Sequence, residues 1–244
     1  MMSRRRRPLT WILPFAASAV VLVAVACDET GDTRTDSQTF DADGATSALV
    51  KIEMGTGRLN IGGGGSSLAE TDFTYNVDDW EPRVDYDVVG DRGELRVRQP
   101  SDNDLSILDF DDVEYRWELA LSDELPTELD VALGAGKSRM ELGGTGVNEL
   151  NVSTGAGSAT IDLTGDWDHD LRGKIESGAG KVTLKLPADV GVRIETDQGI
   201  GDIDRSGLDK DGDVYTNAAF GTSDVSIDLE IESGVGEINL EVVE

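Results

Sequence analysis

The chain has 244 residues, of which 49 are acidic and 21 basic, so its formal net charge is −28. Binding DNA or RNA through phosphates needs clustered Lys and Arg, and this charge argues against a nucleic-acid partner. The single cysteine excludes an internal disulfide, and the single histidine excludes histidine-based triads and multi-histidine zinc sites. Glycine occupies 29 positions, well above its usual share, and needs a structural reason.

Residues 1–26 have the pattern of an export signal, in which four consecutive arginines precede a long apolar run. The run ends in small residues directly before Cys27. This arrangement resembles the lipobox of bacterial lipoproteins, although Ala24 stands where leucine is usual. The resemblance implies a diacylated Cys27 and an exported protein, lipid-anchored to the bacterial membrane and facing outside the cytoplasm. An uncleaved signal anchor or an ordinary signal peptide is the alternative.

Cleavage before Cys27 removes four arginines and no acids, which leaves 17 basic and 49 acidic residues and a net charge of −32. Residues 27–36 are polar and lack periodicity. We therefore expect them to form a tether between the lipid anchor and the folded body.

An internal repeat is the strongest signal in the rest of the chain. Apolar residues alternate on both sides of six Gly-x-Gly centres, but the phase of the alternation changes across each centre. A straight strand cannot change phase without turning its apolar row outward, so each centre is predicted to be a structural corner. The corner glycines are Gly55 and Gly57, Gly134 and Gly136, Gly155 and Gly157, Gly178 and Gly180, Gly199 and Gly201, and Gly234 and Gly236.

Successive centres at Gly134, Gly155, Gly178 and Gly199 lie 21, 23 and 21 residues apart, which suits a coil of two short strands. Residues 129–244 are therefore predicted to form a single-chain β-solenoid within an all-β fold. A β-sandwich with hairpins at the same spacing is the alternative. Arg205 replaces an apolar core position, so its coil is expected to be irregular or to pair Arg205 with Asp202 or Asp204.

Residues 37–128 are predicted to form an N-terminal β region, in which the stretch between the centres at Gly55 and Gly134 interrupts the repeat. Alternating segments in that stretch predict an inserted antiparallel β-strand region, and the stretch holds seven of the thirteen aromatic residues. We expect these aromatic side chains to cover one end of the solenoid, and a recognition surface is the alternative.

Several segments resemble a known family. Residues 69–77, 80–84 and 93–100 resemble the N-terminal domain of the toast-rack family. The Gly-x-Gly segments and residues 214–221 resemble the adjoining adhesin-like and LiaF-like solenoid repeats. The resemblance covers roughly residues 37–244 and implies a β-solenoid of the bacterial envelope, with some members linked to cell-wall stress responses. It brings no catalytic residues to this chain.

Two motifs invite a ligand-binding interpretation. The segment from Gly134 to Ser138 looks like part of a phosphate-binding loop, but the motif's first glycine is replaced by Val131. Asp209, Asp211 and Asp213 alternate as cation ligands do, yet the glycine and glutamate of a calcium loop are missing. We expect a strand at the first and a solvated turn at the second, and no cofactor.

The sequence therefore predicts a non-catalytic cell-envelope lipoprotein whose adhesin-like β-solenoid acts as a binding or scaffold module. Its partner would be the membrane, through the lipid anchor, together with a protein or a cell-wall glycan. One alternative is an accessory regulator of a membrane or cell-wall stress response, as the LiaF-like resemblance implies. Another is a carbohydrate-active enzyme. Self-association through exposed solenoid ends is a further option.

Overall fold

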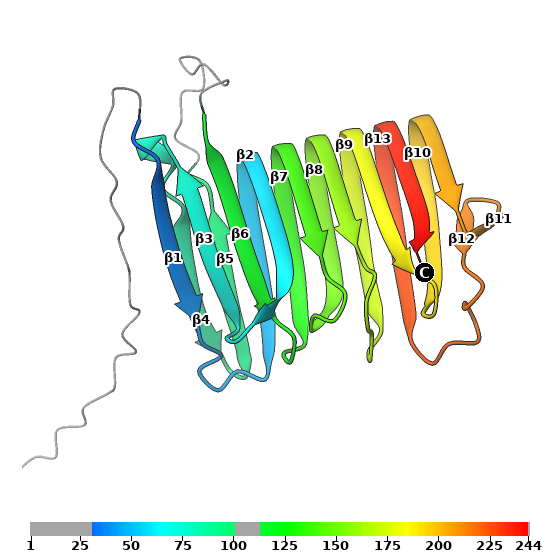
Figure 1. The fold of residues 1–244 in the computed structure, drawn as a ribbon, viewed down its shortest axis with the longest axis horizontal. Coiled ribbons are helices and arrows are strands. Elements are labelled where there is room, and N and C mark those ends of the chain that lie inside the picture. The colour runs from blue at the N-terminus through cyan, green and yellow to red at the C-terminus, as the bar shows by residue number, and fades with distance from the viewer. Residues whose placement is uncertain (1–30, 101–112, 244) are drawn as a thin grey trace, which may run out of the picture.

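A computed structural model describes residues 31–100 and 113–243, which build an elongated β-solenoid (Figure 1). The predicted signal, Cys27 and the first residues of the predicted tether lie outside the described residues. Strand β1 (Arg34–Phe40) begins inside the segment expected to be a tether, because it pairs with β3 (Ala69–Tyr75) along its whole length.

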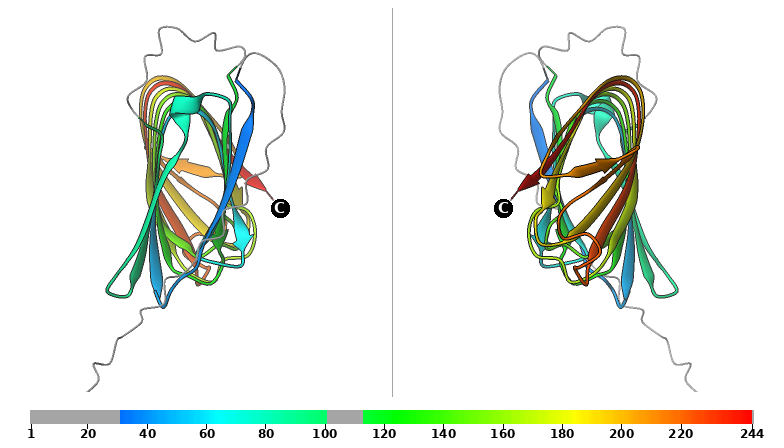
Figure 2. Two further views of the ribbon diagram at one scale, coloured as in Figure 1. Left: turned by 90° about the vertical axis from the view of Figure 1, so that its left-hand side faces the viewer. Right: turned by 90° about the vertical axis from the view of Figure 1, so that its right-hand side faces the viewer.

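Six long strands carry the Gly-x-Gly centres, and each strand bends there. Seen along the stack, the coils superimpose as a flattened loop, with the halves of each strand on opposite sides (Figure 2). Neighbouring long strands pair in parallel and in register, which confirms the solenoid and sets aside a sandwich of hairpins. These strands are β2 (Ser47–Gly65), β7 (Thr127–Glu141), β8 (Val147–Asp162), β9 (Leu171–Pro187), β10 (Gly191–Ser206) and β13 (Ser226–Val243).

The last strand of the chain does not end the stack. Strand β13 lies between β9 and β10, so the coil of Gly199 and Gly201 is the terminal one. A hairpin of β11 (Asp209–Asp211) and β12 (Val214–Thr216) pairs with the first half of β10. The second half of β10 pairs with β13 alone, within the described residues, and leaves an open sheet edge there.

The opposite end of the solenoid carries a cap. Strands β5 (Arg92–Arg98) and β6 (Tyr115–Ser122) pair in parallel with the two halves of β2 and so form one more coil without a Gly-x-Gly centre. Among the described residues at this end, β1, β3 and β4 (Arg83–Val89) are the antiparallel strands outside this coil, and the short 3-10 helix η1 (Asp78–Trp80) lies between β3 and β4. The interrupting region is therefore antiparallel only in its outer strands.

A glutamine that follows β5 contacts the first Gly-x-Gly bend. The side-chain carbonyl of Gln99 accepts hydrogen bonds from the backbone N–H groups of Gly55, at 2.7 Å, and Thr56, at 3.0 Å. These donors belong to the first Gly-x-Gly bend. The Gln99 side chain thus satisfies backbone groups at the point where the repeat begins.

The core lies between the two halves of the coils, and its residues follow the predicted change of phase. In β7, Leu129, Val131 and Leu133 before the corner and Met140 after it are at most 3% exposed. At the cap end the core becomes aromatic. The rings of Trp80 and Tyr115 meet edge to face with centroids 5.2 Å apart, and Phe73 and Trp117 do so at 5.5 Å. All four are at most 4% exposed, which confirms an aromatic layer inside the cap.

Candidate functional site

The six Gly-x-Gly corners lie in register along one edge of the solenoid. Gly57, Gly136, Gly157, Gly180, Gly236 and Gly201 stack on one another in that order. Each of these second glycines has a φ between +134° and +154°, a conformation that other residues rarely adopt. A Cβ on Gly136 would lie 2.1 Å from the carbonyl oxygen of Gly57, so the coils also approach too closely for a side chain. These glycines are therefore required for the backbone bend and for the close approach of neighbouring coils.

The residue after each corner points outward, and together these residues form a row across the sheet. We call them the post-corner row. Each member pairs with the next, and Arg116 of β6 joins the row through its register with Arg58. The row changes sign along the solenoid, from three cations at the cap to two anions at the far end. In spatial order it consists of Arg116, Arg58, Lys137, Ser158, Lys181, Glu237 and Asp202.

A pocket of about 640 Å³ opens at the cationic end of this row. Arg58, Arg116 and Lys137 line it, together with Glu114 and the ring-bearing residues Trp80 and Tyr115. The Tyr115 hydroxyl donates a hydrogen bond to the Trp80 carbonyl at 2.8 Å. Burial raises the pKa of Tyr115 far above its usual value, so this hydroxyl stays neutral at physiological pH. The charge of the pocket therefore comes from its cations and Glu114.

The three cations differ in their partners. The guanidinium of Arg116 lies 3.6 Å from Glu114 and 3.8 Å from Glu118. The side chains of Arg58 and Lys137 have neither an ion pair nor a hydrogen bond with any residue that the structure describes. Like charges side by side on neighbouring strands repel each other. The pocket thus concentrates positive charge that its described surroundings only partly neutralise.

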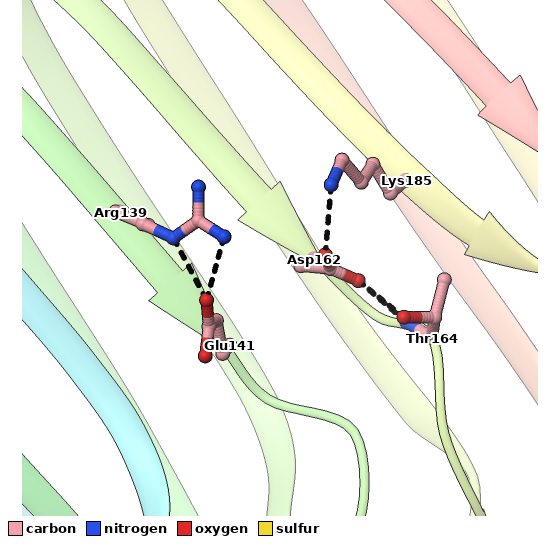
Figure 3. A network of polar contacts seen from close by, with 5 residues as sticks. All are labelled: Arg139, Glu141, Asp162, Thr164 and Lys185. Atoms are coloured by element: carbon pink, nitrogen blue, oxygen red, sulfur yellow. Dashed lines mark hydrogen bonds and ion pairs between the residues drawn. The ribbon is translucent and has the colours of Figure 1, made fainter.

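Elsewhere on the same face the cations have carboxylate partners (Figure 3). Arg139 lies 2.7 Å from Glu141, and the Lys185 ammonium lies 3.2 Å from Asp162. Thr164 donates hydrogen bonds to Asp162 from its backbone N–H, at 3.1 Å, and from its hydroxyl. Burial alone raises the pKa of Asp162, but the hydrogen bonds from Thr164 and Lys185 outweigh it and lower this pKa below its usual value.

The weak cation candidate formed by Asp209, Asp211 and Asp213, where the sequence predicts a solvated turn, does not assemble into a metal site. Asp209 and Asp211 lie in β11 and Asp213 follows in the turn, and all three side chains are exposed. Among the described residues, no three His, Cys, Asp or Glu side chains come together as a metal site would require. The backbone carbonyl of Asp213 instead accepts a hydrogen bond from the N–H of Thr196 at 2.9 Å.

The sequence left two expectations for Arg205, an irregular coil or an ion pair with Asp202 or Asp204, and the structure shows no such ion pair among the described residues. The Arg205 guanidinium lies 5.9 Å from the centre of the Tyr215 ring, and none of the ion pairs in the described part of the chain involves it. The physical reason is its place in the terminal coil. No further coil in the described part of the chain covers this part of β10, so Arg205 remains exposed although it occupies a core register position.

Comparisons with known proteins agree with this architecture. The family model described as the N-terminal domain of toast_rack, DUF2154, matches residues 29–185. A solved structure from Clostridium sporogenes ATCC 15579, provisionally named a cell adhesion protein, is 30% identical with a TM-score of 0.83. That similarity covers 87% of this chain and 100% of the other.

Two further solved structures are much less similar. One, provisionally named an adhesin, comes from Bacteroides fragilis NCTC 9343 and shares 10% identity, with a TM-score of 0.26 over 86% of this chain and 97% of its own. The other, provisionally named a lipid binding protein, comes from Parabacteroides distasonis ATCC 8503 and shares 12% identity, with a TM-score of 0.26 over 88% and 98%. Scores this low carry no argument about function.

A search of curated proteins found no match. No helix within residues 31–100 and 113–243 is long and apolar enough to cross a membrane. The family model spans more than half of the chain, and the Clostridium protein shares its fold at 30% identity. The chain therefore belongs to the toast-rack family.

Proposed function

We propose that the protein is a non-catalytic binding or scaffold module of the adhesin-like type, held on the outer side of a bacterial membrane by lipid on Cys27. The observation that carries this proposal is the long, in-register face of the solenoid. Continuous backbone ladders join its coils about 4.8 Å apart, so the outward side chains form fixed rows. Such rows suit contact with an extended partner, and the Clostridium relative, provisionally named a cell adhesion protein, supports this reading.

The position of the cap supports an orientation on the membrane. Arg34, where β1 begins, lies seven positions after Cys27, so the tether reaches at most about 25 Å. Strand β1 is the outermost strand at the cap end. A lipid on Cys27 would therefore keep the cap near the bilayer and direct the terminal coil of β10 away from it.

Replacing Cys27 with serine tests the anchor. The wild-type protein is expected to sediment with membranes, and Cys27→Ser is expected to release it into the soluble fraction. Thr30→Ser, a conservative change nearby, serves as the matched control. Unchanged membrane association of Cys27→Ser would remove the lipid anchor from the proposal.

A separate experiment tests binding. The Cys27→Ser protein is added to isolated cell envelopes of the producing organism, and saturable sedimentation is expected. Crosslinking of the anchored protein then identifies the partner. Recovery of a sensor kinase would favour the regulatory alternative, and the absence of saturable binding would refute the binding module.

A further inference from the structure

We propose that the pocket beside the cap binds phosphate groups of an extended anionic ligand, with Arg58, Arg116 and Lys137 as the contact residues. This inference rests on the proposed function and adds a ligand chemistry to it. Guanidinium groups donate paired hydrogen bonds to phosphate oxygens, and an ammonium group contributes a compact charge beside them.

The arrangement of the three cations indicates the shape of the ligand. They occupy one register position on the adjacent strands β6, β2 and β7, so they follow each other at about 4.8 Å. They form a row of roughly 10 Å rather than converging on one point. A row of this kind fits successive phosphate groups of a polymer, or neighbouring headgroups, better than a single free ion.

The other cations on this face have close carboxylate partners, which sets Arg58 and Lys137 apart. Lys181 lies 2.9 Å from Glu237, Lys185 lies 3.2 Å from Asp162, and Arg139 lies 2.7 Å from Glu141. Arg58 and Lys137 have no such partner within the described residues. The chain has 49 acidic residues against 21 basic ones, so it offers carboxylates in excess for neutralising any cation. Leaving two adjacent cations without a described carboxylate partner keeps them available to an external anion.

Arg116 completes the row with a guanidinium that is only loosely paired. It lies 3.6 Å from Glu114 and 3.8 Å from Glu118, farther than a normal hydrogen bond. The charge and the shape of the row therefore point to the same ligand chemistry.

The site lies close to the proposed anchor. In the cap, Thr35 of β1 pairs with Thr74 of β3, which pairs with Arg116, so two threonines continue this register position from the cationic row to the start of β1. That strand begins seven residues after Cys27. Phosphate could thus come from lipid headgroups of the same membrane or from a phosphate-bearing polymer of the envelope. The chemistry is the same, and the experiment separates the two sources.

The test uses the full exported chain carrying Cys27→Ser, so that a lipid cannot itself drive membrane binding. Inorganic polyphosphate is titrated by calorimetry, and vesicles of phosphatidylglycerol or of phosphatidylcholine are tested by sedimentation. Binding of polyphosphate alone identifies a polymer, whereas binding of phosphatidylglycerol vesicles alone identifies headgroups. Binding is expected to weaken strongly in about 0.5 M salt, because the site is open to solvent.

A pair of double variants with the same change in net charge decides whether the site is specific. Arg58→Gln with Lys137→Gln removes the two cations without described partners, and binding is expected to weaken roughly 100-fold, about tenfold per contact. Arg139→Gln with Lys181→Gln removes two ion-paired cations from the same face and is expected to change binding less than about threefold. Thermal unfolding curves show whether each variant is folded.

Several outcomes would overturn the proposal: no binding to either probe, an unchanged affinity in the first double variant, or equal losses of affinity in both double variants.

Residues 101–112 contain five aspartates directly before the pocket residue Val113, so a chain with asparagine at these five positions is titrated in parallel. Absence of binding to both chains counts against the site. Phosphate binding without envelope binding would refute the proposed function but not the phosphate site. Envelope binding by the first double variant at wild-type affinity would refute the phosphate site but not the proposed function.

Discussion

Replacing Gly180 with alanine tests the corner geometry directly. Gly180 has a φ of +143°, and a Cβ built on it would lie 1.8 Å from the carbonyl oxygen of Gly157 in the neighbouring coil. The obstacle is backbone rather than the end of a flexible side chain, so it cannot simply rotate away. The coils of β8 and β9 would have to move apart at the bend.

The expected cost has two contributions. Forcing alanine into this glycine conformation costs about 1–3 kcal/mol. Separating two coils that lie about 4.8 Å apart by roughly 1 Å weakens at least two ladder hydrogen bonds, at about 1 kcal/mol each. We therefore expect Gly180→Ala to lower the free energy of unfolding by about 3–5 kcal/mol.

Urea unfolding followed by circular dichroism measures this loss, with a second probe to check whether the transition remains two-state. Gly144→Ala is the matched control, because Gly144 also has a positive φ, +76°, but nothing lies within 4 Å of the position that an alanine Cβ would occupy there. It is expected to lose only about 1 kcal/mol. Equal losses in the two variants would refute the role of close coil approach.

Three further variants probe other parts of the fold. Asn217→Ala should lower the free energy of unfolding by about 2–4 kcal/mol, because this buried amide bonds two carbonyls and one N–H of the β9–β10 connection; a loss below about 1 kcal/mol in urea would contradict it. Arg205→Leu should promote self-association, because it removes an inward charge that keeps the open sheet edge from pairing with another chain. Light scattering that still reports only monomer would argue against this role of Arg205. Asp162→Asn should narrow the stability difference between neutral and acidic pH. The lowered pKa of Asp162 means that its stabilisation is present above the unfolded-state pKa and is lost as the pH falls through the folded-state pKa, below 3.8. Urea midpoints at several pH values measure this, and a variant with an unchanged pH profile would exclude Asp162 as a contributor.

The sequence repeat accounts for two of the three cations in the pocket. Arg58 and Lys137 directly follow their Gly-x-Gly centres, so aligning the repeats by these glycines would have placed them in one row. Arg116 has no such centre before it and joins the row only through the pairing of β6 with β2. Asn217 likewise stands outside the repeat, and its three hydrogen bonds reach groups 25 to 30 residues away in sequence.

The sequence by itself determined the corners, because the change of phase around each glycine pair is a local property of a strand whose side chains alternate. It also predicted the aromatic cap and the lipid site at Cys27, which lies outside the described residues. Only the tertiary structure decided that β13 enters between β9 and β10 and that β5 and β6 form a further coil. Any strand with the right alternation can pair with any other. The order of pairing therefore depends on how the whole chain closes its core. The cationic row of Arg116, Arg58 and Lys137 depends on the same closure, because it exists only where β6, β2 and β7 are neighbours.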